Sequence, residues 1–182
     1  MDIVLYEKLI KAVRAAFTGL FEKHNEEFYY CTLITDGEGN GPFISAWSKE
    51  ALNKYIMDEE ISKEEELDYK WSYADSPYCA YGWEYFKDVE DYIIKNKPSC
   101  DCDINDWNIW TNSVIDTMEK VLMDLDKQGL FGVGDKRKGI VLNAEIMPPD
   151  YTNTLRALRL NDEGDIKDWL EEIAEELDEY RF

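Results

Sequence analysis

The stretch that decides the fold is FYYCTLITDGEGNGPFISAW, residues 28–47. Its two ends, residues 28–35 and 43–47, are rich in aromatic and β-branched side chains, which favour β-strands. Between them lie Gly37, Gly39 and Gly41 among polar neighbours, a composition typical of turns. The stretch therefore predicts a β-hairpin.

Amphipathic helices are predicted on both sides of this hairpin. Residues 2–24 and 104–125 place apolar side chains at intervals of three and four, and Gly129 follows the second run as a stop signal. Shorter helices are expected at residues 48–57, with Ser48 as the cap, and at residues 86–97, 152–160 and 165–180. Further strands are predicted at residues 69–73, where aromatic side chains alternate, and at residues 140–146.

The order of these elements indicates the fold class. Strands and helices do not alternate as they do in a parallel sheet, and most helices lie in the second half of the chain. The length of 182 residues suits one domain. We therefore expect a single α+β domain over residues 1–182, with a mostly antiparallel sheet of about four or more strands and helices packed mainly on one face.

The net charge of the chain indicates which classes of partner it is expected to bind. It has 40 acidic and 20 basic residues, a formal net charge of −20 at pH 7. Such a charge repels phosphate backbones and anionic lipid surfaces, so we expect no binding to nucleic acid or membrane. The sequence also shows neither a membrane-spanning run nor a signal peptide, which favours a cytoplasmic location.

Histidine and cysteine usage gives no metal or catalytic site. His24 is the only histidine, and its place near the end of the first predicted helix suits a cation that complements the helix dipole. Cys31, Cys79, Cys100 and Cys102 lack the paired spacing of a zinc site, and we expect free thiols. We predict no metal, no cofactor and no identifiable catalytic residue.

A basic loop suggests an alternative, enzymatic function. Residues 129–139 combine glycines with Lys136, Arg137 and Lys138. A helix leads into this loop and a strand leaves it, the reverse of a phosphate-binding loop, so a helix stop with a basic turn is favoured. Many carboxylates could still converge in a cleft. The alternative is therefore a small carboxylate-dependent hydrolase or transferase that holds an anionic substrate on residues 136–138.

The segment from residue 69 to residue 92 is unusually aromatic. It holds nine Tyr, Trp and Phe residues. Such side chains fill cores and also concentrate at recognition surfaces, and the sequence leaves both interpretations open. On the recognition interpretation, the partner-binding residues are Trp71, Tyr73, Tyr78 and Trp83.

Acidic residues gather in two segments. Residues 58–68 carry seven acids and one lysine. On the helix predicted at residues 165–180, Glu171 with Glu175, Glu172 with Glu176, and Glu175 with Glu179 are like-charge pairs, each costing about 0.2–0.5 kcal/mol. Either these acids form a solvated face, or they form an electrostatic surface that attracts a basic protein partner.

Three segments carry a family resemblance. They are residues 28–36 (FYYCTLITD), residues 71–78 (WSYADSPY) and residues 129–132 (GLFG), the last leading to the strand at residue 140. Together they resemble the bacterial domain-of-unknown-function family 4303, over most of the chain. The resemblance implies a small bacterial cytosolic protein and transfers no catalytic residue. By analogy with acidic immunity proteins, we expect a non-catalytic binding protein that neutralises a basic toxin.

Overall fold

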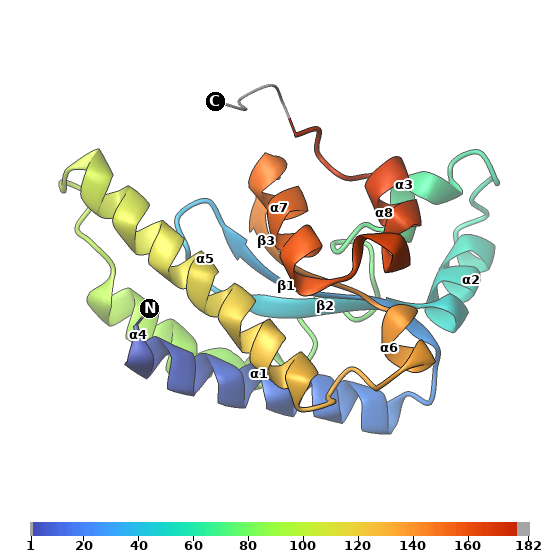
Figure 1. Cartoon of the computed structure of the whole chain (residues 1–182), viewed down its shortest axis with the longest axis horizontal. Coiled ribbons are helices and arrows are strands. Elements are labelled where there is room, and N and C mark those ends of the chain that lie inside the picture. The colour runs from blue at the N-terminus through green and yellow to red at the C-terminus, as the bar shows by residue number, and fades with distance from the viewer. Residues whose placement is uncertain (1, 178–182) are drawn as a thin grey trace.

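The computed structural model describes residues 2–177, and within them three strands form one mixed sheet between helices (Figure 1). β1 (Phe28–Asp36) is the central strand. β2 (Phe43–Ser48) pairs with it antiparallel, and β3 (Val141–Met147) pairs with it parallel on the other side. The predicted hairpin is confirmed as β1 and β2.

Helices cover both faces of this sheet. α1 (Ile3–Lys23) and α5 (Ile104–Lys127) pack together on one side, where η1 (Trp83–Phe86) and α4 (Lys87–Asn96) lie against α1. α3 (Glu66–Lys70), α7 (Tyr151–Leu160) and α8 (Lys167–Glu172) lie on the other side, and α2 (Lys49–Asp58) stands at one end (Figure 1). The short α6 (Asp135–Lys138) and η2 (Glu163–Asp165) lie in connections.

The α+β class is confirmed, but the predicted sheet is wrong in detail. Among the described residues it has three strands rather than four or more, and β3 is parallel to β1. A parallel neighbour needs a crossover connection, and α5 within that connection covers one face while α7 returns on the other side. The expectation of helices mainly on one face is therefore also wrong.

Residues 69–73 do not form the predicted strand. The chain there completes α3 and continues in turns. The alternating aromatic side chains contact different partners: Tyr69 lies against Tyr55, Trp71 against Tyr30, and Tyr73 against Phe43. Alternation here reflects three separate packing contacts and not one face of a strand.

The helix predicted at residues 165–180 is shorter than expected. α8 ends at Glu172, so Glu175 and Glu176 follow it in irregular chain, and Glu179 lies outside the described residues. Ending the helix here separates the like-charge pairs that a longer helix would have aligned, and the Thr154 hydroxyl donates to the backbone carbonyl of Glu175 at 2.8 Å.

The two faces of the sheet differ in chemistry. Side chains alternate between faces along each strand. The face toward α1 and α5 is apolar and fully buried: Cys31, Leu33, Ile44, Ala46, Leu142 and Ala144. The opposite face is also buried but carries polar groups: Tyr30, Thr32, Ser45, Asn143 and Glu145. This polar face underlies the candidate site.

Side chains from the α7 region close the outer edge of β3. The Asn161 amide accepts from the Leu142 N–H at 3.0 Å and donates to the Leu142 carbonyl at 2.8 Å. Asn153 makes the same pair of bonds with Ile146, at 2.9 and 3.2 Å. Amide side chains thus take the place of a neighbouring strand, and the edge is covered without one.

Within residues 2–177, no helix combines the length and apolar character that a bilayer crossing requires. The same part of the chain contains no group of three or more His, Cys, Asp or Glu side chains placed to hold a metal ion. All four cysteines are free thiols, as predicted, and burial raises the pKa of Cys31.

Candidate functional site

The fold brings the two acidic segments together at one end of the molecule. Residues 58–68 lead into α3, and residues 162–177, with eight acids and one lysine, contain α8. The ammonium group of Lys70 contacts the carboxylate of Glu172 at 2.6 Å, and the Trp71 indole N–H donates to the same carboxylate at 2.7 Å. We call these two segments the acidic end; α3 and α8 mark it in Figure 1.

A groove runs through the acidic end, with a volume of about 510 Å³. Its apolar lining includes Leu52 on α2, Trp169 on α8, Trp71 directly after α3 and Ile166 directly before α8. Charged side chains surround this lining: Glu66, Asp165, Asp168, Lys49, Lys70 and Lys167. The groove therefore offers an apolar floor within a charged rim, the usual anatomy of a protein-binding surface.

A second cavity, which we call the inner pocket, lies over the polar face of the sheet. Its volume is about 260 Å³, and Trp71 and Trp169 line both it and the groove. The remaining lining includes Tyr30, Tyr73 and Asp68, together with Glu145 on β3 and Glu175 after α8. Three carboxylates and four aromatic rings thus surround one small space.

Glu145 is the most perturbed acid of the inner pocket. Only 7% of the residue is exposed, and this burial raises the pKa of its carboxyl to about 7. A hydrogen bond from the Tyr30 hydroxyl opposes the rise, and the nearby charge of Glu175 adds to it. Burial also raises the pKa of Glu175. Both acids can therefore change charge closer to neutral pH than ordinary glutamates.

Two further polar side chains near Glu145 lack partners. Asn143 precedes Glu145 by two residues on the same strand face, and Thr32 on β1 is paired with Asn143. Both are fully buried and near enough to Glu145 to lower the pKa of its carboxyl. Among the described residues, the Thr32 hydroxyl and both polar atoms of the Asn143 amide make no hydrogen bond of normal geometry. Buried polar atoms are rarely left in this state.

The residues predicted to bind a partner are divided among several places. Trp71 and Tyr73 line the inner pocket with Glu175, and Glu172 stands beside Trp71. Glu171 and Glu176 are exposed at the acidic end.

The other two predicted aromatic residues lie away from this group. Tyr78 is buried beside the end of α1 and hydrogen-bonds there to Glu26. Trp83, on η1, is 71% exposed, and neighbouring Tyr85 is 47% exposed. The four aromatic residues therefore do not share one surface.

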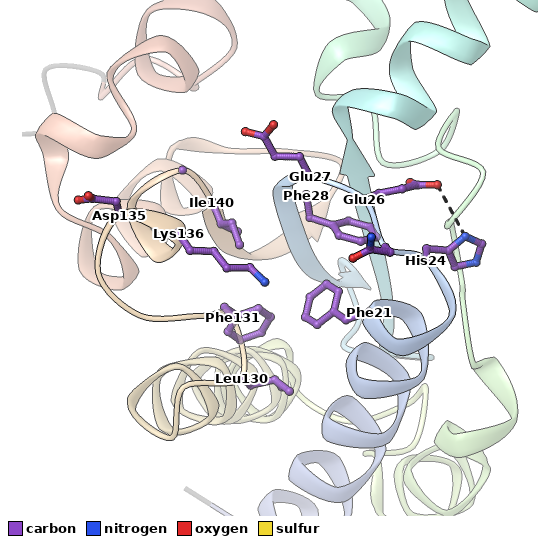
Figure 2. A pocket seen from close by; sticks show the side chains of 12 residues that line it. Phe21, His24, Glu26, Glu27, Phe28, Leu130, Phe131, Asp135, Lys136 and Ile140 are labelled. Carbon is purple, nitrogen blue, oxygen red and sulfur yellow. Dashed lines mark ion pairs between the residues drawn. The ribbon is translucent and has the colours of Figure 1, made fainter.

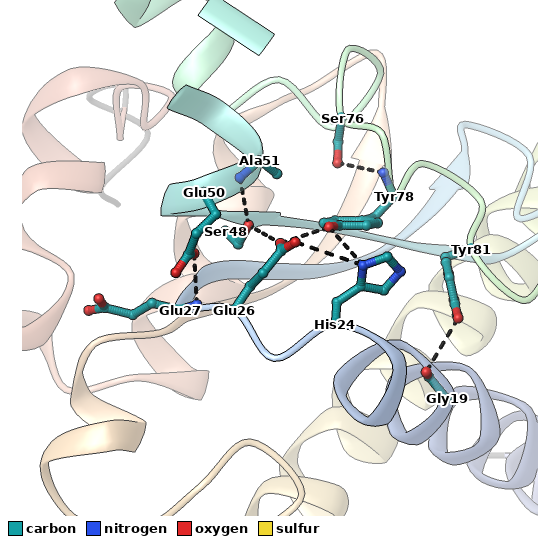
Figure 3. A network of polar contacts seen from close by, with 10 residues as sticks. All are labelled: Gly19, His24, Glu26, Glu27, Ser48, Glu50, Ala51, Ser76, Tyr78 and Tyr81. Carbon is teal, nitrogen blue, oxygen red and sulfur yellow. Dashed lines mark hydrogen bonds and ion pairs between the residues drawn. The ribbon is translucent and has the colours of Figure 1, made fainter. Parts of the chain in front are cut away.

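Tyr78 belongs to a polar network that joins α1 to α2 (Figure 3). The Glu26 carboxylate accepts from the hydroxyls of Tyr78, at 2.7 Å, and of Ser48. Nδ1 of His24 lies 3.2 Å from the Tyr78 hydroxyl and 3.8 Å from Glu26. Ser48 also accepts from the Ala51 N–H as the cap of α2. The Ser48 hydroxyl contacts Glu26 and not His24, so these residues do not form a Ser–His pair. The network instead links the end of α1 to the start of α2.

The basic loop borders a third cavity of about 180 Å³ (Figure 2). Its apolar wall consists of Phe21, Phe28, Leu130, Phe131 and Ile140. Lys136 extends along this wall toward the end of α1, where Glu26 and Glu27 also line the cavity. Arg137 does not line it, because its guanidinium is paired with Asp126 at 2.6 Å. One of the three predicted bases is thus available to a ligand here.

Comparison with known protein families matches residues 9–162 to a domain of unknown function, DUF4303. The chain belongs to the DUF4303 family. No curated protein and no solved structure matches it. The matched region of this DUF4303 protein includes all three strands and the polar face with Glu145. It ends before α8, which carries Trp169 and Glu172, and before Glu175 in the chain after α8.

Sequence reasoning missed the polar face of this DUF4303 protein. The signal was present in residues 140–147, where Asn143 and Glu145 occupy alternate positions of an otherwise apolar strand. Alternation of this kind is usually interpreted as a solvent-exposed face, and the sequence does not reveal that α8 and residues 71–76 cover it. Trp169 and Glu175, which line the inner pocket together with Glu145, lie more than 20 residues further along the chain.

Proposed function

We propose that this DUF4303 protein is a non-catalytic binding protein whose acidic end attracts and binds a basic protein partner. The observation that carries the proposal is the junction of α3 and α8 through Lys70, Trp71 and Glu172. It unites two acidic segments that lie about a hundred residues apart in sequence, as the separation of 102 between Lys70 and Glu172 records.

Charge and shape at the acidic end both support protein binding. Most of its acids are exposed, and Lys70 and Lys167 are paired with Glu172 and Glu171. A surface of one charge accelerates association with an oppositely charged partner, and the effect weakens as salt rises. The apolar floor of the groove, with Trp71 and Trp169, supplies contact area once the partner has arrived.

The proposed biological setting is the bacterial cytoplasm, with the protein acting as an immunity protein that neutralises a basic toxin. Acidity and the absence of a recognised catalytic arrangement in the sequence support this setting, and family membership assigns no activity of its own.

Charge neutralisation tests the proposal. In one variant, Glu59→Gln, Glu64→Gln, Asp168→Asn and Glu176→Gln remove exposed acids of the acidic end that hold no ion pair within residues 2–177. The matched control removes four exposed acids near α4 and the start of α5: Asp88→Asn, Glu90→Gln, Asp101→Asn and Asp106→Asn.

Immobilised wild-type protein should retain a basic protein from lysate of its own cell at about 50 mM salt and release it at about 500 mM. The control variant should behave like the wild type, and the first variant should retain at least tenfold less of that protein. Equal retention by both variants, or no basic protein at low salt, would contradict the proposal.

A second candidate function rests on the cavity beside the basic loop. This cavity does bring Lys136 together with the carboxylates of Glu26 and Glu27, as the alternative of a carboxylate-dependent hydrolase requires. The test is hydrolysis of 4-nitrophenyl phosphate and 4-nitrophenyl acetate by the wild type, Lys136→Ala and Lys138→Ala. Activity that Lys136→Ala abolishes and Lys138→Ala leaves intact would support an enzyme; a rate equal to buffer in all three proteins would exclude these reactions.

A further inference from the structure

We propose that the inner pocket is a binding site for an organic cation, of the size of a guanidinium or alkylammonium group, held between Glu145, Glu175 and the rings of Trp71 and Trp169. This pocket shares Trp71 and Trp169 with the groove of the acidic end, but the proposal does not depend on a protein partner docking in that groove. The proposal rests on the lining of the pocket, on the buried carboxyl of Glu145 within that lining and on a cation that is already bound nearby.

The lining has the composition of a cation site. Carboxylates supply opposite charge, and indole and phenol faces attract cations through their ring quadrupoles. Glu145 lines the pocket from β3 and Glu175 lines it from the chain after α8. The volume of about 260 Å³ is sufficient for a guanidinium group and its alkyl stem.

The unpartnered amide of Asn143 lies on the same strand face as Glu145 but outside the lining of the pocket. Its oxygen and nitrogen are both fully buried and unpartnered among the described residues, as is the hydroxyl of neighbouring Thr32. Leaving such atoms without a hydrogen bond costs about 1–3 kcal/mol each. The polar face around Glu145 therefore carries a cost in free energy that its own hydrogen bonds do not offset.

The outer side of the same wall already shows the proposed chemistry. The ammonium group of Lys70 lies 4.9 Å from the centre of the Trp71 ring and 2.6 Å from the Glu172 carboxylate. One indole and one carboxylate thus hold a cation of the chain itself. The inner side presents Trp71 with Glu145 and Glu175, and among the described residues its lining includes no lysine or arginine.

The charges around Glu145 favour a cation on balance. The pocket is lined by Glu175 from the chain after α8 and by Asp68 from α3, together with Tyr30 from β1 and Tyr73 from the turns after α3. Arg156 on α7 opposes them, but its guanidinium already donates to the Ala144 carbonyl, Thr152 and Asn153.

Binding should depend on pH, because a cation prefers the ionised form of Glu145. Burial places the pKa of that carboxyl at about 7, so most molecules carry the proton at pH 5.5 and have lost it at pH 8. Since only the ionised fraction is competent, the apparent Kd should be about 30-fold weaker at pH 5.5 than at pH 8.

The experiment titrates the whole chain with matched probes and follows tryptophan fluorescence and heat of binding. Ethylguanidinium represents a free cation, with neutral ethylurea as its control. The peptide acetyl-Gly-Arg-Gly-amide represents the side chain of a protein partner, with the citrulline peptide as its control. We expect saturable binding of at least one cationic probe at pH 8, with at least tenfold preference over its neutral control.

The variants Glu145→Gln and Glu175→Gln should each weaken that binding at least tenfold, and Glu145→Gln should also remove most of its pH dependence. Glu64→Gln at the acidic end should leave it unchanged. Glu175 lies in irregular chain near the surface, so its variant gives a result even if the Glu145 variant folds poorly.

Binding of ethylguanidinium would assign the site to small molecules, and binding of the arginine peptide alone would assign it to a side chain of a partner; both support the proposal. Equal binding of neutral and cationic probes, or unchanged affinity in both variants, would overturn it. Absence of saturation by either cation would also overturn it. Neutralising Glu59, Glu64, Asp168 and Glu176 leaves the inner pocket intact, so the two proposals can fail separately.

Discussion

The two faces of the central sheet are equally buried but chemically opposite. On the side of α1 and α5, residues such as Leu33, Ile44 and Leu142 meet helices that are themselves apolar along the contact. On the other side, Thr32 and Asn143 are buried without a hydrogen-bond partner among the described residues, and buried Glu145 accepts a hydrogen bond from Tyr30. The first face removes apolar surface from water and stabilises the fold, whereas the second includes groups whose burial costs free energy.

This difference indicates where the molecule gives up stability for another purpose. The like charges of the C-terminal segment seemed to be such a place on sequence grounds, but α8 ends before they align, and Glu172 forms contacts that favour its ionised form. On the polar face, the hydrogen bond from Tyr30 to Glu145 does not offset burial, which still raises the pKa of that carboxyl. A buried acid beside an unpartnered amide is a functional candidate because the fold gains nothing from it.

The largest expected effect comes from breaking the apolar side. Phe17 on α1 is fully buried and packs edge-on against Phe131 with ring centres 5.0 Å apart. Phe17→Ala should lower the free energy of unfolding by about 3–5 kcal/mol, through lost transfer energy and a new cavity. Urea denaturation followed by circular dichroism measures the loss. A change below about 1 kcal/mol would mean that this side of the sheet is not the stabilising one.

An intermediate effect, of opposite sign, is expected on the polar side. The pKa of Glu145 is about 7 in the folded chain against an ordinary 4.5, so between these values the folded state keeps a proton that the unfolded state has lost. Its contribution to stability therefore falls as pH rises from about 4.5 to about 7 and is constant above. Glu145→Gln cannot ionise and should lack this loss.

The measurement compares urea unfolding of the wild type and Glu145→Gln at pH 5 and pH 8. The stability of the variant relative to the wild type should be higher at pH 8 than at pH 5, by an amount on the order of 3 kcal/mol. Taking the difference between the two proteins cancels the other titrating groups. A relative stability that does not change with pH would show that Glu145 titrates normally and that the polar face is accessible to water.

The sequence predicted the apolar side far better than the polar side, for a physical reason. Periodicity along α1 and α5 and the composition of residues 28–47 are local signals, and those elements form as expected. The parallel pairing of β3 with β1 is not local, because it depends on a crossover of about a hundred residues that only tertiary packing directs.

The candidate site was less predictable still. The acidic segments were identified from composition, but their union depends on Lys70 meeting Glu172, and neither residue is unusual in sequence. Asn143 and Glu145 resemble exposed strand positions until the chain around Trp71 and Trp169 covers them. A pair of charges can be counted from sequence, whereas burial of one carboxyl can be recognised only from the fold.

The smallest expected effect sharpens the comparison most, because it uses one substitution on each face. Thr32 faces the polar side with an unpartnered hydroxyl, and Thr35, on the other side of β1, donates from its hydroxyl to the Asn40 carbonyl at 2.8 Å. Valine replaces the hydroxyl by a methyl group of similar size. Thr35→Val should lose about 1 kcal/mol with its hydrogen bond, and Thr32→Val should gain up to about 1 kcal/mol, because a buried group without a partner is removed.

Urea unfolding of both valine variants at pH 7 shows whether each substitution raises or lowers the free energy of unfolding. If Thr32→Val also loses stability, its hydroxyl must have a partner in solution, and a bound water or ion would then satisfy the polar face without any ligand. If Thr32→Val gains stability, the hydroxyl of Thr32 costs free energy in folding, and equivalent substitutions on the two faces then have opposite effects. A face that serves folding alone is not expected to keep a buried group whose removal stabilises the protein.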